Sequence, residues 1–142
     1  MPADQRAEFR IASVSAQAMA TLAVLHRDPN AIHLDAAAAA AAGLGDRVVN
    51  PGAANLGYVL NALAILAPTG RIEQLDVAFR TNVLAEDEVI ATAAVEHLDL
   101  TEDATRLYCR VTLDVASRAR ALEGTATIAM PAASQSGAAQ AG

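Results

Sequence analysis

The feature that most constrains the fold is a change of hydrophobic period at Arg71. Before it, residues 53–67 carry an apolar stripe at helical spacing, while alanine and glycine keep the other faces thin. A helix that is apolar nearly all round is typical of the middle of a domain. After it, apolar residues alternate in four successive segments, which predicts an antiparallel sheet. We therefore expect an α+β fold in which the sheet wraps around one long central helix.

The boundaries of the smaller elements follow from residues that begin and end helices. Ser13 or Ser15 can cap a first helix, which must end at or before Asp28 because Pro29 disfavours helical geometry in its predecessor. Asp35 can cap a short helix of seven alanines that ends at Gly43. Strands are expected at residues 72–79, 89–98, 106–115 and 122–130, with a short edge strand at residues 9–11.

A length of 142 residues suits one domain with its own core. We expect that domain at residues 9–131, between a loose N-terminal segment (1–8) and a disordered tail (132–142). The sequence has a formal net charge of −6, and its ten basic residues are all arginine, which argues against nucleic-acid binding. The sequence shows no signal-peptide pattern and no apolar run long enough for a bilayer, so we expect a cytoplasmic protein without membrane contact. The exposed edges of such a sheet predict a homodimer or a higher homo-oligomer.

Residues 27–35 concentrate the side chains that carry proton chemistry. Asp28 and His33 are an acid and an imidazole five residues apart across an Asp-Pro turn. Such a pair can act in general acid–base catalysis. From the residues alone a structural ion pair is the favoured interpretation, since Asp-Pro and Asn are common turn formers. No metal site is expected, because His26, Asp28 and His33 lack the spacing of a ligand set.

Three stretches, DPNAIHLD (28–35), VVNPG (48–52) and DVAFRTNVLAEDEVI (76–90), together resemble the MaoC-like dehydratase family, which includes the (R)-specific enoyl-CoA hydratases. Residues 28–35, DPNAIHLD, resemble the signature D-x-N-P-[IL]-H-x-D. Residues 48–52, VVNPG, fall where the family has V-H-G-M at the start of its central helix. Residues 76–90 resemble the family's strand pair V-x-F-x-x-P-V-x-x-G-D-x-[VL]. The resemblance spans residues 9–130 and implies a hot-dog fold, an antiparallel sheet wrapped around a central helix.

The resemblance also implies roles for single residues. Asp28 and His33 occupy the catalytic positions, and Asn30 keeps the amide that holds the turn. The family's oxyanion donor is the backbone N–H of a glycine. Aligning the sequence from His33 without a gap places Pro51 at this position, whereas allowing one inserted residue places Gly52 there. We favour Gly52 because proline has no N–H. Substrate-binding candidates near this donor and the catalytic pair are Asn30, Asn50, Asn55 and Tyr58, although core packing is an equal alternative for Tyr58.

The activity that the resemblance implies is a lyase that reversibly hydrates trans-2-enoyl thioesters to (R)-3-hydroxyacyl thioesters. The acyl group would be carried on CoA or on an acyl carrier protein, with no cofactor besides the CoA thioester that is the substrate. A thioesterase is one alternative, which the absence of an acid in residues 53–67 disfavours. A non-catalytic subunit of a heteromeric dehydratase is another.

Two groups of charged residues have open roles. Residues 86–88 are interpreted as a solvated acidic turn. Five arginines are candidates for the phosphates of the thioester carrier, with a solvated sheet face as the alternative: Arg80, Arg106, Arg110, Arg118 and Arg120. The single cysteine, Cys109, is expected to be a buried structural thiol.

Overall fold

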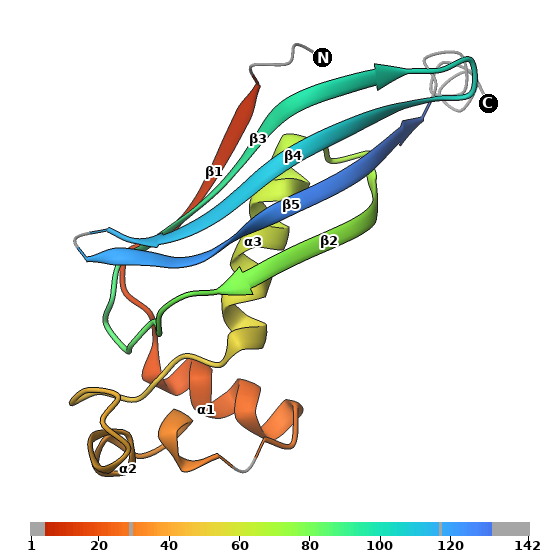
Figure 1. Ribbon diagram of the computed structural model, residues 1–142. Coiled ribbons are helices and arrows are strands. Elements are labelled where there is room, and N and C mark those ends of the chain that lie inside the picture. The colour runs from red at the N-terminus through yellow and green to blue at the C-terminus, as the bar shows by residue number, and fades with distance from the viewer. Residues whose placement is uncertain (1–4, 29, 117, 132–142) are drawn as a thin grey trace.

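The computed structural model describes residues 5–28, 30–116 and 118–131. One long helix lies against a curved, five-stranded antiparallel sheet, as expected from the change of period (Figure 1). The elements, in chain order, are β1 (Arg6–Ile11), α1 (Ala16–Leu25), a 3₁₀ turn (Ala31–His33), α2 (Ala36–Ala41), α3 (Gly52–Leu66), β2 (Arg71–Phe79), β3 (Val89–Leu100), β4 (Ala104–Val115) and β5 (Ala119–Pro131).

The sheet has the order β1-β3-β4-β5-β2, so β2 lies at one edge and pairs with β5. The core forms between its concave face and α3. Alternate residues of β3, among them Val89 and Val95, face Val59 and Leu63 on the helix and are almost fully buried. Alanines fill the remaining positions and let the helix approach the sheet closely. This α+β architecture is the hot-dog fold.

The N-terminal strand begins earlier than predicted. Residues 6–8 were expected in a loose segment, but they pair with β3, where Arg6 lies opposite Ala94. The reason is an alternation that starts with Ala7 and continues through Phe9 and Ile11, all of which pack on the core. Glu8 lies on the other face and pairs with neighbouring arginines. The predicted tail at residues 132–142 lies outside the described residues.

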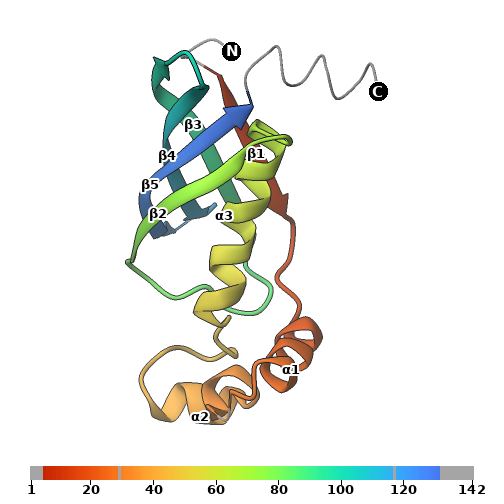
Figure 2. The ribbon, with the colours of Figure 1, turned by 90° about the vertical axis from the view of Figure 1, so that its right-hand side faces the viewer.

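Two short helices extend the molecule beyond the N-terminal end of α3. In both views α1 and α2 lie together below the sheet, next to the first turn of α3 (Figures 1 and 2). Ser15 caps α1 and Asp35 caps α2, as their positions predict. Gly43 ends α2 in the left-handed region, with φ of 74°. None of the helices in the described residues is long and apolar enough to cross a membrane.

The acidic turn at residues 86–88 is exposed at Glu86 and Glu88, as expected, but its middle residue is buried. Asp87 is only 8% exposed, and its carboxylate accepts hydrogen bonds from Arg47, Arg118 and the backbone N–H of Leu84. A buried carboxylate requires such partners because burial removes its hydration. The prediction failed at Asp87 because Arg47 and Arg118 are far from it in the sequence.

Candidate active site

The C-terminal end of α1 fixes the position of Asp28. The N–H of Asp28 bonds to the carbonyl of Ala23, and the N–H of Arg27 bonds to that of Val24. This is the Schellman arrangement, which requires a left-handed residue after the helix. Arg27 takes that conformation with φ of 52°, although glycine would adopt it at lower cost. Asp28 is therefore held directly after a strained residue.

A second set of local bonds positions His33. Asn30 accepts a hydrogen bond from the N–H of Ile32 and caps the 3₁₀ turn that ends at His33. The N–H of Asn30 in turn donates to Asp28 Oδ1 (3.0 Å). The imidazole is largely buried, and its Nδ1 lies 2.7 Å from the carbonyl oxygen of Val49. Asn30 thus orders the turn between the acid and the imidazole, as the resemblance implies.

Asp28 and His33 are in direct contact. His33 Nε2 lies 3.2 Å from Asp28 Oδ2, and the Asp28 side chain remains 36% exposed. Because a carbonyl oxygen only accepts, the bond to Val49 requires the proton on Nδ1. The neutral imidazole then presents the lone pair of Nε2 toward Asp28, and a proton on Nε2 gives an imidazolium paired with the carboxylate. The pair can therefore take up and release one proton at a fixed atom.

The N-terminus of α3 supplies hydrogen-bond donors close to this segment of the chain. Gly52 is the first helical residue, and Pro51 precedes it as the N-cap without a side-chain bond. The N–H groups at the start of a helix have no partner within the helix, and the helix dipole makes this end favourable for negative charge. Pro51 lacks an N–H, so in this geometry Gly52 is the first residue of α3 that has one to donate.

Three of the substrate-binding candidates form a separate buried cluster. Asn50 Nδ2 donates to Asn55 Oδ1 (2.7 Å) and lies 3.4 Å from the hydroxyl of Tyr58. Burial raises the pKa of Tyr58, while its bond with Asn50 lowers it less. The Tyr58 ring also stacks on Phe9 of β1. Asn30 belongs instead to the turn at Asp28, so the four candidates divide between two places.

The five candidate arginines all have acidic partners. Four of them pair with carboxylates on exposed parts of strands: Arg80 with Glu123, Arg106 with Glu73, Arg110 with Glu96, and Arg120 with Asp114 and Glu123. Arg118 belongs to the buried cluster at Asp87. This arrangement favours the solvated sheet face over a phosphate site.

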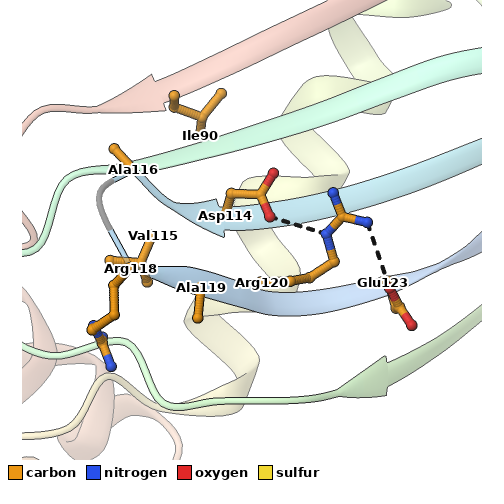
Figure 3. A pocket seen from close by; sticks show the side chains of 8 residues that line it. All are labelled: Ile90, Asp114, Val115, Ala116, Arg118, Ala119, Arg120 and Glu123. Atoms are coloured by element: carbon orange, nitrogen blue, oxygen red, sulfur yellow. Dashed lines mark hydrogen bonds and ion pairs between the residues drawn. The ribbon is translucent and has the colours of Figure 1, made fainter.

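A shallow hollow at the β4–β5 turn contains two of these arginines. Figure 3 shows Asp114, Arg120 and Glu123 paired in it, on the face of the sheet opposite α3. None of the residues from the Asp28 segment or the start of α3 lines it. The hollow is therefore separate from the candidate active site.

Two contributors to the site were not predicted from the sequence. Val49 acts through its backbone carbonyl, for which no side-chain pattern exists. Arg27 acts through its left-handed backbone, and the only sequence signal is its place two residues before a proline. Both depend on how the chain folds locally rather than on side-chain chemistry.

The fold and the site define a class: a hot-dog domain with an acid–imidazole pair near the N-terminus of its central helix. A family model described as MaoC like domain matches residues 2–117. The chain therefore belongs to the MaoC-like family. No curated protein matches the sequence.

Solved structures share the fold at low sequence identity. The R-hydratase PhaJ1 from Pseudomonas aeruginosa is 21% identical with a TM-score of 0.80, over 92% of this chain and 83% of that one. The (R)-hydratase from A. caviae involved in PHA biosynthesis is 24% identical with a TM-score of 0.79, over 92% and 98%. The ChsH1-ChsH2 complex from Mycobacterium tuberculosis is 16% identical with a TM-score of 0.77, over 92% and 98%.

Proposed function

We propose that this protein is a hydro-lyase that reversibly hydrates trans-2-enoyl thioesters to (R)-3-hydroxyacyl thioesters, carried on CoA or on an acyl carrier protein. The observation that carries the proposal is the 3.2 Å contact between His33 Nε2 and Asp28 Oδ2. Membership of the MaoC-like family and the likeness to R-hydratases support it. The proposal requires no cofactor other than the thioester substrate.

In the proposed reaction, one water molecule binds beside the Asp28–His33 pair, where both side chains can hold it. His33 Nε2 takes a proton from this water, and its oxygen forms a bond to the β-carbon of the enoyl group. The π electrons of the double bond move to the α-carbon and the thioester oxygen as an enolate. The proton on Nε2 then passes to the α-carbon, so one water is added and the imidazole is regenerated. Asp28 stabilises the imidazolium while it exists.

The start of α3 would stabilise the enolate. Its charge develops on the thioester oxygen, and the Gly52 N–H together with the helix dipole provides a fixed positive environment for it. A side chain at residue 52 would lie against Phe79, because a Cβ built there comes 3.4 Å from the Phe79 ring. An alanine at this position would therefore add only a methyl group in van der Waals contact with the ring and would keep the N–H.

The structure disfavours a thioesterase that would use an acid on the central helix. Residues 52–66 of α3 contain neither aspartate nor glutamate. A role as non-catalytic subunit remains a distinct alternative, since one structural neighbour is a two-protein complex. The retained Asp28–His33 contact argues against that role.

One assay separates the three functions. Purified protein is mixed with crotonyl-CoA, and loss of the enoyl absorbance is followed together with release of free thiol. Loss of absorbance without thiol is the expected result, with (R)-3-hydroxybutyryl-CoA as product. Release of thiol would show a thioesterase. Neither signal, with crotonyl-CoA or with longer enoyl-CoA, would contradict the proposal.

The state of assembly is part of the proposal. The edge strands β1 and β2 each have one unpaired side within the described residues, so we propose a homodimer or higher homo-oligomer. Light scattering of the purified chain tests this, and a monomer at micromolar concentration would contradict it.

A further inference from the structure

The cluster of Asn50, Asn55 and Tyr58 is more polar than core packing requires. Asn50 and Asn55 are 5% and 3% exposed, and an apolar residue would satisfy packing at either position. Their mutual hydrogen bond uses only one polar atom of each amide. The proposed acid–base step uses none of the three side chains, so their polarity needs another explanation.

Each amide has a second polar atom for which the described residues provide no partner. These atoms are Asn50 Oδ1 and Asn55 Nδ2. Flipping both side-chain amides exchanges the donor and the acceptor, but the same two positions still lack a hydrogen bond. Within the described part of the chain, no fully buried side-chain nitrogen or oxygen lacks a partner. The two atoms are therefore reached by solvent, although their residues are more than nine-tenths buried.

The Tyr58 hydroxyl adds a third free function. It accepts the long bond from Asn50, which leaves its own hydrogen available for another acceptor. Burial raises the pKa of this phenol, so it keeps its proton at neutral pH. The cluster thus offers donors and an acceptor without any charge, and such a set binds a hydroxyl or carbonyl group better than a carboxylate.

The cluster lies along the path beyond the proposed oxyanion site. Asn55 and Tyr58 are three and six residues after Gly52, which places them roughly 4.5 and 9 Å further along the axis of α3. An acyl chain whose thioester oxygen is at Gly52 and which follows the helix passes these residues after its β-carbon.

Given the proposed hydratase function, we propose that Asn50, Asn55 and Tyr58 form a subsite for a neutral oxygen-bearing group on the acyl chain, beyond the β-carbon. The preferred substrates are then hydroxylated or oxo-substituted enoyl thioesters rather than plain alkyl ones. A plain chain leaves the buried amide atoms without a partner, which lowers its binding.

Equilibrium binding tests the subsite without turnover. Isothermal titration calorimetry compares two saturated thioesters, hexanoyl-CoA and 5-hydroxyhexanoyl-CoA. We expect the hydroxylated compound to bind roughly tenfold more tightly to the wild type. Tyr58→Phe, which removes a single oxygen, should reduce this ratio several-fold. Equal affinity of the two compounds, or no binding of either, would overturn the subsite.

Matched variants separate recognition from a structural role. Tyr108→Phe changes the other tyrosine, on the outer side of the sheet beside His97, and Asn61→Leu changes an exposed asparagine of α3; neither should alter the ratio. Asn55→Leu should reduce it as Tyr58→Phe does. If Asn55→Leu does not fold, Tyr58→Phe decides. A Tyr58→Phe protein that is less stable but keeps the wild-type ratio would show that the cluster is structural only.

Turnover distinguishes this inference from the hydratase proposal. The kcat/KM values for trans-2-hexenoyl-CoA and its 5-hydroxy derivative should differ in the same direction as the affinities. Equal kcat/KM and equal affinity would overturn the subsite while the hydratase function stands. Tighter binding of the hydroxylated compound without hydration of either enoyl thioester would support the subsite and overturn the hydratase function.

Discussion

Asp28 and Asp87 are both aspartates in contact with a nitrogenous side chain, yet their surroundings are opposite. Asp87 is 8% exposed, and its oxygens accept from Arg118 at 2.9 Å, from Arg47 at 3.2 Å and from the N–H of Leu84 at 2.8 Å. The Asp28 side chain is 36% exposed, and its polar partners among the described residues are one imidazole and one backbone N–H. The first carboxylate is saturated with donors, whereas the second has capacity left for a ligand.

The cationic partners differ in a way that matters for chemistry. An arginine stays charged at every accessible pH, so the Asp87 cluster cannot exchange protons with a substrate. An imidazole nitrogen can accept and donate a proton, so the Asp28 pair can exchange one with a substrate. A carboxylate surrounded by several donors and permanently charged arginines is therefore typical of a structural site. A partly exposed carboxylate beside an imidazole is typical of a reactive one.

The two sites are also mechanically linked. Arg47 donates to the carbonyl of Ala85 and to Asp87, and the segment that follows pairs with residues 83–85. That segment contains Val49, whose carbonyl holds His33. The Asp87 cluster therefore positions the backbone on which the imidazole of the candidate site depends.

The largest expected effect is on catalysis at Asp28. Asp28→Asn keeps the acceptor for the Asn30 N–H but cannot stabilise an imidazolium, so kcat/KM for crotonyl-CoA should fall by about 10²–10⁴-fold. The free energy of unfolding should change by less than about 1 kcal/mol, because the pair is partly exposed. Asp35→Asn, which keeps the cap of α2, is the matched control and should retain activity. Near-normal turnover of Asp28→Asn would remove the distinction between the two aspartates.

The second-largest effect is expected at Gly52, and it tests whether the candidate site needs the N–H of this residue besides its acid–base pair. Gly52→Pro removes the proposed oxyanion donor at the first helical position, where proline is well tolerated, and should lower kcat by about 10²–10³-fold. Gly52→Ala keeps the N–H and adds only a methyl group against Phe79, so its loss should be much smaller. Steady-state kinetics with crotonyl-CoA checks both variants. Equal losses of kcat in the two variants would mean that the added atoms of the proline ring or of the alanine methyl group are responsible, and not the missing N–H.

The third effect falls on stability at Asp87. Asp87→Asn leaves Arg47 and Arg118 without their shared carboxylate and should lower the free energy of unfolding by about 2–4 kcal/mol. Urea unfolding followed by circular dichroism measures it, with Asp28→Asn as the matched aspartate change. If Asp87→Asn costs no more than Asp28→Asn, saturation with donors does not separate a structural from a reactive aspartate.

The sequence predicts those parts of the molecule that local rules control. The apolar stripe of α3, the alternation of β3 to β5, the caps at Ser15 and Asp35 and the end of α1 before Pro29 all depend on neighbouring residues, and the structure confirms them. The short separation of Asp28 and His33 within one turn belongs to the same group, and the contact is present.

The features that were missed depend on residues distant in the chain. Asp87 pairs with arginines 40 and 31 residues away, and Arg106 of β4 reaches past β5 to Glu73 of β2. Register across a sheet decides such pairs, and one sequence does not show that register. The carbonyl of Val49 is 16 residues from His33 and carries no side-chain signal at all.

The smallest expected effect, on stability and on activity, comes from an exposed ion pair that belongs neither to the Asp87 cluster nor to the Asp28–His33 pair. Arg120 bonds to Asp114 at 3.0 Å in the hollow on the outer face of the sheet, and both side chains are well exposed. The pair raises the pKa of Arg120, but water screens most of the interaction. Arg120→Gln should therefore lower the free energy of unfolding by less than about 1 kcal/mol and leave kcat/KM unchanged, as thermal unfolding and the crotonyl-CoA assay can show. A tenfold fall in kcat/KM would mean that this hollow contacts the thioester carrier, and the outer face would then belong to the site.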